Sequence, residues 1–241
     1  IPGIYHASDK VPNNLAEKSS QIKHMGDVPL PCYSDYISEL RSYSTSEETF
    51  AGLKKNLVLM MEGSRGCFAK CDFCGFNTNW NGFRKLEASS VASNAETLAS
   101  RYGVRSIFFV DNVCDTWAEK YAGEMISRGI NLNGYMELRA HHKESFWTSL
   151  RLAGVNTIQV GVESVSRHLL QKMRKGTTVI QNLRAHKYIC ELNIRSGANL
   201  ITHHPKSNLD DVLETRRVVE LISHMQPFNL SRFAVSIGSP I

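Results

Sequence analysis

The chain has 241 residues, of which 42% are hydrophobic and 21% are charged, and its formal net charge is +5. This length can bury the core of one large α/β domain or two small ones, and the composition is that of a soluble globular protein. No apolar run is long enough to span a bilayer and the basic residues are scattered, so we expect neither a membrane nor a nucleic-acid partner. Six cysteines, half of them in one cluster, favour a metal site in a reducing cytoplasm over a disulfide framework.

Residues 1–55 are rich in Pro, Ser, Asn and charged residues and lack sustained periodicity. They predict a connecting segment with one short helix near residues 33–43, which we expect to follow a domain upstream of Ile1. From residue 56 onward, short apolar runs typical of buried strands alternate with amphipathic helical stretches. The predicted strands cover residues 56–62, 106–112, 131–140, 156–164, 194–202 and 229–238. The predicted helices cover residues 87–103, 116–129, 143–154, 178–193 and 208–225.

Strands that alternate with helices, without a hairpin signal, predict parallel pairing through crossover connections. The first strand is not followed by G-x-G-x-x-G, which disfavours a dinucleotide-binding sheet. The sequence therefore predicts an α/β protein in which residues 56–241 form a partial (β/α)6 TIM-like barrel of parallel strands. The irregular connecting segment, residues 1–55, precedes this barrel.

The stretch EGSRGCFAKCDFCGFN holds Cys67, Cys71 and Cys74 in a C-x3-C-x2-C spacing. It follows the first strand, on the barrel face where active sites are built. Four thiolates would complete a structural zinc site or an iron–sulfur cube, whereas three leave one iron with an open position. An amino-acid head group, with its amine and carboxylate, can occupy that position. A zinc site completed by His203 or His204 and a chance grouping of buried cysteines are the alternatives.

The stretch GCFAKCDFC, with Phe73 directly before the third cysteine, resembles the signature of radical S-adenosylmethionine (SAM) enzymes. The resemblance implies a partial (β/α)6 barrel in which Cys67, Cys71 and Cys74 hold a [4Fe-4S] cluster and Phe73 contacts the cofactor. It also implies that SAM binds to the cluster. After reduction by a system such as flavodoxin or ferredoxin, SAM is cleaved to methionine and a 5'-deoxyadenosyl radical, which abstracts hydrogen from a substrate.

Further stretches of the same resemblance supply candidate SAM contacts. FFVDN places Asp111 and Asn112 where such enzymes grip the methionyl amine. In YMELRA, strand alternation puts Glu137 and Arg139 on one face. Because an unpaired charge inside a barrel is costly, these two residues are either cofactor contacts or partners of each other in a salt bridge.

The fourth strand carries another set of candidates. QVGVES places Gln159 and Glu163 on one face, with Ser164 at the strand's end, and resembles the G-x-E-S stretch of cobalamin-linked radical enzymes, near the ribose and methionyl carboxylate of SAM. MRKGTT resembles the M-x-K-G-x-T of that group, and Asn199 on the fifth strand is a candidate ribose contact. THHPKS stands where related sequences carry a G-x-P-G-E-like loop, so the role of this loop is left open.

The stretches FFVDN, GVNTIQVGVESVSRHLLQKMRKGTT and HMQPFNLSRF resemble radical SAM enzymes that mature ribosomally made peptides (RiPP maturation). The expected substrate is therefore a precursor peptide, modified by C-methylation or by epimerisation. C-methylation requires cobalamin as methyl carrier, held by a domain that precedes Ile1. The C-x3-C-x2-C spacing differs from the longer first spacing of one large peptide-methylating subgroup, which disfavours methylation.

Epimerisation instead requires a thiol that returns hydrogen to the opposite face of the α-carbon. Cys114 is the candidate donor, because it directly follows the second strand on the expected active-site face, and a small buried hydrophobe is the alternative. We expect Cys190 to lie in the core and Cys32 to be incidental. Two further functions stay open: a radical SAM enzyme that acts on a small molecule or lipid, and a non-catalytic iron–sulfur protein for electron transfer or sensing.

Overall fold

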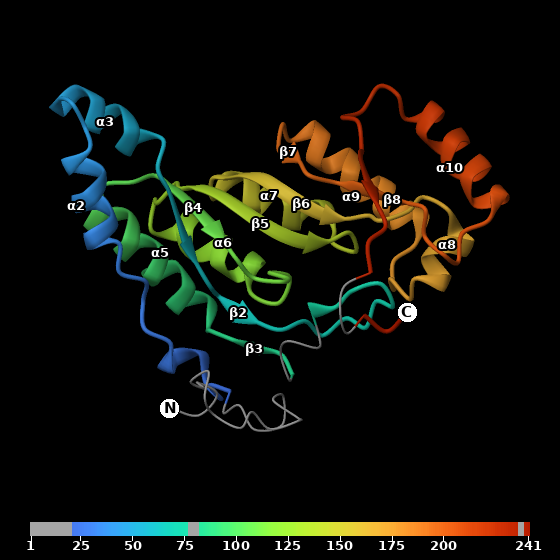
Figure 1. Ribbon diagram of the computed structural model, residues 1–241, viewed down its shortest axis with the longest axis horizontal. Helices are drawn as coiled ribbons and strands as arrows, with labels where there is room; N and C mark the ends of the chain where they lie inside the picture. Colours follow the sequence, from blue (N-terminus) through green and yellow to red (C-terminus); the bar gives the residue numbers. More distant parts are fainter. Residues whose placement is uncertain (1–20, 77–81, 236–238) are drawn as a thin grey trace, which may run out of the picture.

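The computed structural model describes residues 21–76, 82–235 and 239–241. The segment before the sheet holds η1 (Met25–Asp27), α2 (Ser34–Ser42) and α3 (Glu47–Lys55). The strands are β1 (Val58–Met61), β2 (Ser64–Arg65), β3 (Arg84–Lys85), β4 (Ser106–Phe109), β5 (Asn133–Arg139), β6 (Val155–Gly161), β7 (Arg195–Ser196), β8 (Asn199–Thr202) and β9 (Asn229–Arg232). The remaining helices are α5 (Ala88–Tyr102), α6 (Ala118–Ser127), α7 (Glu144–Leu152), α8 (Arg167–Lys172), α9 (Val179–Glu191) and α10 (Leu209–Leu221) (Figure 1).

Five parallel strands form the central sheet, in the order β1-β4-β5-β6-β7. Each strand is paired with the next strand of this series along the chain, and a helix lies in each connection (Figure 1). Glu137 of β5 stands opposite Gln159 of β6, and Arg139 stands opposite Gly161. The predicted partial TIM-like arrangement of parallel strands is confirmed.

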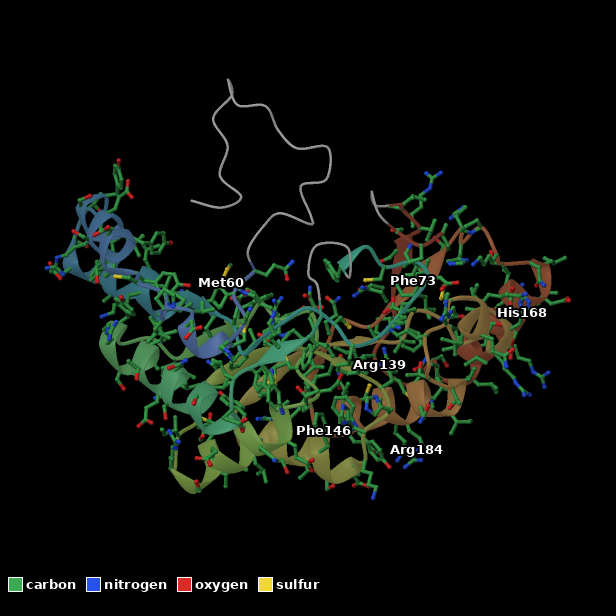
Figure 2. The ribbon with its side chains drawn as sticks, turned by 90° about the horizontal axis from the view of Figure 1, so that it is seen from below. Met60, Phe73, Arg139, Phe146, His168 and Arg184 are labelled. Atoms are coloured by element: carbon green, nitrogen blue, oxygen red, sulfur yellow. The ribbon has the colours of Figure 1, made fainter. Side chains whose placement is uncertain are left out.

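Four helices, α5, α6, α7 and α9, form a row that covers one face of this sheet (Figure 2). Helix α5 shows why: Val91, Ala95, Leu98 and Tyr102 recur at helical spacing, and all four are buried. The helix ends as predicted at Gly103, whose φ of 62° is readily adopted only without a side chain.

The side chains of β5 alternate between the helix-covered face of the sheet and the opposite face. In β5, Met136 and Leu138 are buried against the helix layer, whereas Tyr135, Glu137 and Arg139 are only partly buried and point to the opposite side. The predicted placement of the two charges on one face is therefore confirmed, and it directs them toward the concave side of the sheet.

The fifth predicted strand, residues 194–202, is divided into β7 and β8. The amide of Gly197 donates to the oxygen of Ile158 at 2.8 Å, which ends the pairing with β6. Strand β8 then pairs with β9 in a separate parallel sheet, connected to β6 by a single bridge between Glu163 and Leu200. The sixth predicted strand is β9, and residues 236–238 of its predicted range lie outside the described residues.

Five elements were not predicted, namely η1, α3, α8, β2 and β3. Helix α3 lies inside the expected connecting segment, where the Ser46 hydroxyl caps it by accepting from the Thr49 amide at 3.1 Å. Helix α8 is a six-residue helix, too short for a periodic signal. Strands β2 and β3 pair antiparallel around the cysteine stretch, contrary to the expected absence of antiparallel pairing. The predicted helix near residues 33–43 is confirmed as α2.

Residues 1–20 of the predicted connecting segment lie outside the described residues. In the described part of the chain, every helix is too short or too polar to cross a bilayer.

Gly63, just after β1, is expected to tolerate no side chain. A Cβ at this position would lie 2.8 Å from ring carbons of Trp117, which is itself buried. We therefore expect Gly63→Ala to lower the free energy of unfolding by about 1–3 kcal/mol through overpacking, measured by urea denaturation. Gly52→Ala is the matched control, because nothing lies within 4 Å of a Cβ at that helical position. Equal stability of the two variants would contradict this packing argument.

Candidate functional site

A cavity of about 240 Å³ lies at the carboxyl ends of β5 and β6, beside the loop between β2 and β3. This is the end of a parallel sheet at which ligand sites are built. The sequence-predicted residues that line the cavity are Cys67, Cys71, Phe73, Cys74, Asn112, Glu137, Arg139, Gln159 and Glu163. The fold thus brings together residues that are far apart along the chain.

The three cysteines meet at one wall of this cavity, and all are free thiols. Cys71 is buried, and burial raises the pKa of the Cys67 and Cys74 thiols above their ordinary value. A thiolate at these positions therefore needs the positive charge of bound metal ions. The donor set fits an iron–sulfur cluster, and the adjoining cavity would leave room for a ligand on the iron that no cysteine holds.

The zinc alternative requires the cysteine sulfurs to lie closer together than they do in this structure. Sulfurs that share one zinc lie within about 4.6 Å of each other, because each Zn–S bond is about 2.3 Å. Among the described residues, the cysteine sulfurs do not form a group of three whose members all lie within 4.8 Å. His204 accepts from the Lys206 amide at 3.2 Å and its ring packs against Phe233.

Asp72 fixes the loop that carries the cysteines. Its amide donates to the Met173 oxygen at 3.0 Å, and its carboxylate lies 3.1 Å from the Lys206 ammonium and 3.6 Å from the Arg174 guanidinium. Lys206 belongs to THHPKS, whose role the sequence left open, and the structure gives this stretch a contact with the cysteine loop. The ion pairs are partly exposed, so each contributes at most about 1 kcal/mol.

Lys175 is the site residue that the sequence missed. Its ammonium lies 2.8 Å from the Glu163 carboxylate, and the two side chains are only 8% and 17% exposed. It also lies 5.8 Å from the centre of the Phe73 ring. A Cβ on Gly161 would approach the Lys175 nitrogen to 2.6 Å, so this glycine gives the lysine room. The sequence signal that could have indicated Lys175 is the stretch MRKGTT, which contains this lysine and resembles M-x-K-G-x-T of cobalamin-linked radical enzymes.

Glu137 and Arg139 do not pair with each other, although both line the cavity. Arg139 donates to the backbone oxygen of Lys175, and it lies in the same region as Phe73 (Figure 2). Burial, and secondarily the charge of Glu163, raises the pKa of Glu137 to about 6. Within the described part of the chain, Glu137 is thus a carboxyl that forms no salt bridge, which favours a role toward a ligand over the salt bridge considered above.

Asp111 forms hydrogen bonds to the residues that precede the cysteine loop. It is buried, and its carboxylate accepts from the Gly63 amide at 2.9 Å, from the Ser64 hydroxyl and from the Trp117 indole at 3.3 Å. These bonds connect the end of β4 to the start of the cysteine stretch. The side chain does not line the cavity, so its contribution is to position the loop.

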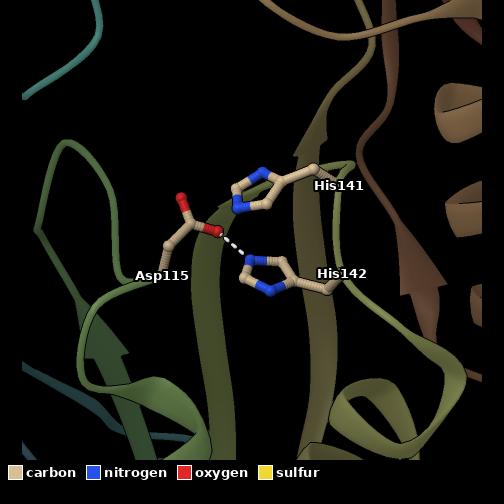
Figure 3. A group of neighbouring side chains, drawn as sticks. All are labelled: Asp115, His141 and His142. Carbon is tan, nitrogen blue, oxygen red and sulfur yellow. Dashed lines mark hydrogen bonds and ion pairs between the residues drawn. The ribbon is translucent and has the colours of Figure 1, made fainter.

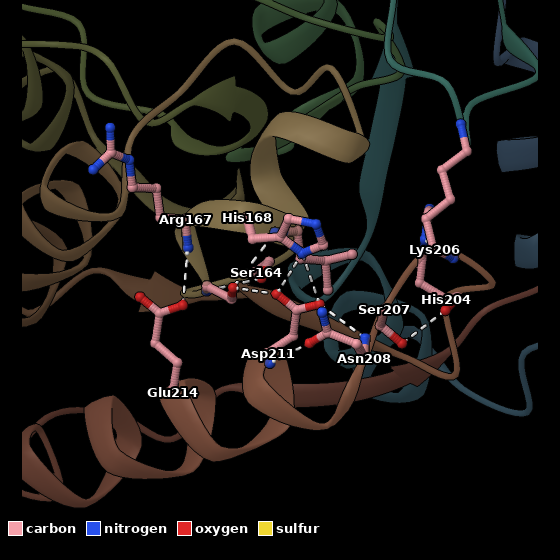
Figure 4. A network of polar contacts seen from close by, with 11 residues as sticks. Ser164, Arg167, His168, His204, Lys206, Ser207, Asn208, Asp211 and Glu214 are labelled. Atoms are coloured by element: carbon pink, nitrogen blue, oxygen red, sulfur yellow. Dashed lines mark hydrogen bonds and ion pairs between the residues drawn. The ribbon is translucent and has the colours of Figure 1, made fainter.

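Ser164 and Asn199 are likewise engaged within the fold. The Ser164 hydroxyl accepts from the Ser166 amide at 3.0 Å, and Ser166 donates to Asp211 at 2.6 Å, in the network that caps α10 (Figure 4). The backbone oxygen of Asn199 accepts from the Glu163 amide at 2.9 Å. Neither side chain lines the cavity.

Cys114 lies in the hydrophobic core with an exposed fraction of 0%, and it does not line the cavity. Burial raises the pKa of its thiol well above the ordinary value. Its amide donates to the Glu137 oxygen at 2.9 Å, so its backbone, rather than its sulfur, supports the site.

Residues 61–219 match the Radical SAM superfamily. The chain is 30% identical over 203 residues to hopanoid C-3 methylase of Methylococcus capsulatus, a match that covers 78% of this chain and 38% of that protein. The cobalamin-dependent radical SAM enzyme OxsB, with aqua-cobalamin bound, superposes with a TM-score of 0.70 at 18% identity, over 88% of this chain and 31% of OxsB. The radical SAM methyltransferase TsrM of Kitasatospora setae superposes with a TM-score of 0.68 at 17% identity, over 80% of this chain and 38% of TsrM.

This chain therefore belongs to the radical SAM superfamily, as the cysteine spacing predicted. Enzymes of this family use a [4Fe-4S] cluster and SAM. The match covers between 27% and 41% of the length of these curated relatives.

The raised pKa of Asp111 should make the free energy of unfolding decrease as the pH rises from about 4 to 6. Burial raises its pKa from 3.8 to about 6, so the folded protein keeps this proton to higher pH than the unfolded chain. Its contribution to the free energy of unfolding is therefore present below about pH 4 and is lost as the pH rises toward 6, on the order of 2–3 kcal/mol. In Asp111→Asn this pH-dependent part should disappear.

Urea denaturation of both proteins across this pH range provides the measurement. Glu137 titrates in the same range in both proteins, and because the Asp111 charge is a smaller cause of its raised pKa, only this coupling remains in the difference. A stability difference between the two proteins that does not change with pH would contradict the prediction.

Proposed function

We propose that this chain is the cluster- and SAM-binding part of a cobalamin-dependent radical C-methyltransferase. The observation that carries the proposal is its 30% identity to a hopanoid C-3 methylase over 78% of the chain. The folds of OxsB and TsrM support it, since both are named as radical SAM enzymes that bind cobalamin. Cobalamin would be held by a segment outside these residues.

In this proposal Cys67, Cys71 and Cys74 hold the [4Fe-4S] cluster and the adjoining cavity receives SAM. When bound, the reduced cluster supplies the electron that cleaves SAM. The other sequence-predicted side chains that line the cavity orient SAM, and they are Phe73, Asn112, Glu137, Arg139, Gln159 and Glu163. Lys175 neutralises Glu163 and keeps its carboxylate in one orientation. Asp111, Ser164 and Asn199 act through the backbone that they hold.

The surroundings of Cys114 favour methylation over epimerisation. A hydrogen donor must reach the substrate radical, and the Cys114 thiol is enclosed in the core. Cys190 is partly buried on α9. Cys32 precedes α2, and its thiol donates a hydrogen bond to the Ser34 hydroxyl. Among the described residues, the only thiols that line the cavity are the three cluster cysteines.

For the substrate, we propose a ribosomally made precursor peptide, on the sequence resemblance to peptide-maturing enzymes. The likeness to hopanoid C-3 methylase makes a hopanoid-like lipid the second class to test. A flavodoxin or ferredoxin is the proposed electron donor. These assignments concern the whole protein, of which this chain is the cluster-binding part.

Substitution of the cluster cysteines tests the site. We expect Cys67→Ala, Cys71→Ala and Cys74→Ala each to abolish formation of 5'-deoxyadenosine, because each thiolate holds a separate iron. The measurement is product quantification after anaerobic reconstitution with iron and sulfide and addition of SAM and dithionite. Cys32→Ala is the matched control and should retain activity, since Cys32 is exposed and remote from the cavity. Retained cleavage in the cluster variants would overturn the assignment.

The reaction itself is tested with SAM that carries a trideuterated methyl group. We expect the full-length protein, loaded with cluster and cobalamin, to transfer this group to its substrate, and Cys114→Ala to retain transfer within about threefold because its thiol is enclosed. Mass spectrometry of candidate peptides and of a hopanoid substrate detects the transfer. A mass-neutral product that takes up deuterium from heavy water, and is lost in Cys114→Ala, would instead establish epimerisation.

A further inference from the structure

A second group of potential metal ligands lies beside the SAM cavity. Asp115 follows β4, and His141 and His142 follow β5. Because β4 and β5 are neighbouring parallel strands, their carboxyl ends meet at the same edge of the sheet. Figure 3 shows the three side chains converging there, with the Asp115 carboxylate facing both imidazole rings.

The three residues offer one ligand atom each, and these atoms all lie within 4.8 Å of one another. One oxygen of Asp115 contacts Nε2 of His142 and also accepts from the Arg139 amide at 3.1 Å. This backbone bond fixes the carboxylate in the way that groups around metal ligands commonly do.

Among the described residues, the other carboxylate oxygen of Asp115 has no hydrogen-bond partner. The Asp115 side chain is only 4% exposed, and this buried oxygen lacks a hydrogen bond. A buried, incompletely paired carboxylate is costly, and a bound cation removes that cost. The Arg139 guanidinium does not supply the charge, because it is directed to the backbone oxygen of Lys175.

The His142 ring packs against two aromatic residues of α7, and the His141 ring packs against that of His142. The His142 ring stacks on Phe146 at 3.7 Å between centres and 6° between planes, and it meets Trp147 edge-on at 5.8 Å. The His141 ring lies 4.2 Å from that of His142. Both Phe146 and Trp147 are buried in α7, so the ring of His142 is positioned by the core rather than by solvent.

We propose that Asp115, His141 and His142 form a binding site for one divalent transition metal ion, with zinc as the best match. Two imidazole nitrogens and one carboxylate oxygen are a ligand set that zinc uses, and three protein ligands leave a fourth position open. That position is accessible to water or to an oxygen or nitrogen atom of a substrate. The site shares no ligand with the cysteine cluster, so it does not depend on the proposed methyl transfer.

Equilibrium dialysis of the tag-free, cluster-loaded protein against zinc sulfate, followed by zinc and iron analysis, tests the site. We expect about one zinc per chain, with the iron content unchanged, which excludes zinc capture by the cysteines. Asp115→Asn and His142→Asn should each weaken zinc binding by at least about tenfold, because each removes a ligand. His224→Asn, an exposed histidine outside the group, is the matched control and should bind zinc like the parent protein.

X-ray absorption at the zinc edge of the parent protein gives a readout that does not depend on the folding of variants. We expect imidazole nitrogen and carboxylate oxygen around zinc, without sulfur. Zinc should also raise the thermal midpoint of the parent and not of Asp115→Asn. The absence of bound zinc, sulfur in its shell, or undiminished binding in both ligand variants would overturn the proposal.

Discussion

The junction at Glu163 is the constraint on which both the fold and the site depend. Its backbone accepts from Ile201 and donates to Asn199, which connects the end of β6 to the separate β8–β9 sheet. It does so with a φ of 62°, a conformation that costs free energy for a residue other than glycine. The same residue turns its carboxylate into the cavity, where Lys175 neutralises it. The strained junction therefore fixes the direction of a site charge.

Successive contacts connect Glu163 to the cysteine loop. Lys175 lies just beyond the end of α8. The backbone oxygen of Met173, which caps this helix, accepts a hydrogen bond from the Asp72 amide. On the opposite side, Asp111 holds the start of the cysteine stretch through the Gly63 amide. The cysteine loop is thus fixed at both sides by strands or helices of the barrel. A loop held in this way loses less conformational entropy when a cluster binds.

Periodicity and spacing predicted most of the barrel. The helix over residues 88–102 and the shared face of Glu137 and Arg139 follow from local patterns, because the helical period and strand alternation are properties of the chain itself. Other features were missed because they depend on partners distant in sequence. Strand β2 pairs with β3 across the cysteine stretch, and β8 pairs with β9 instead of continuing β7 along β6.

The sequence by itself determined the superfamily, the close spacing of Cys67, Cys71 and Cys74 and most of the alternation of strands and helices, because each is encoded in short-range spacing. Tertiary structure decided which polar residues reach the cavity. In the folded chain Glu163 forms a salt bridge with Lys175. Asp111 and Ser164 instead form hydrogen bonds to backbone amides outside the cavity. It also enclosed Cys114 in the core. These outcomes depend on where neighbouring strands end and what packs beneath them, which no single stretch of sequence specifies.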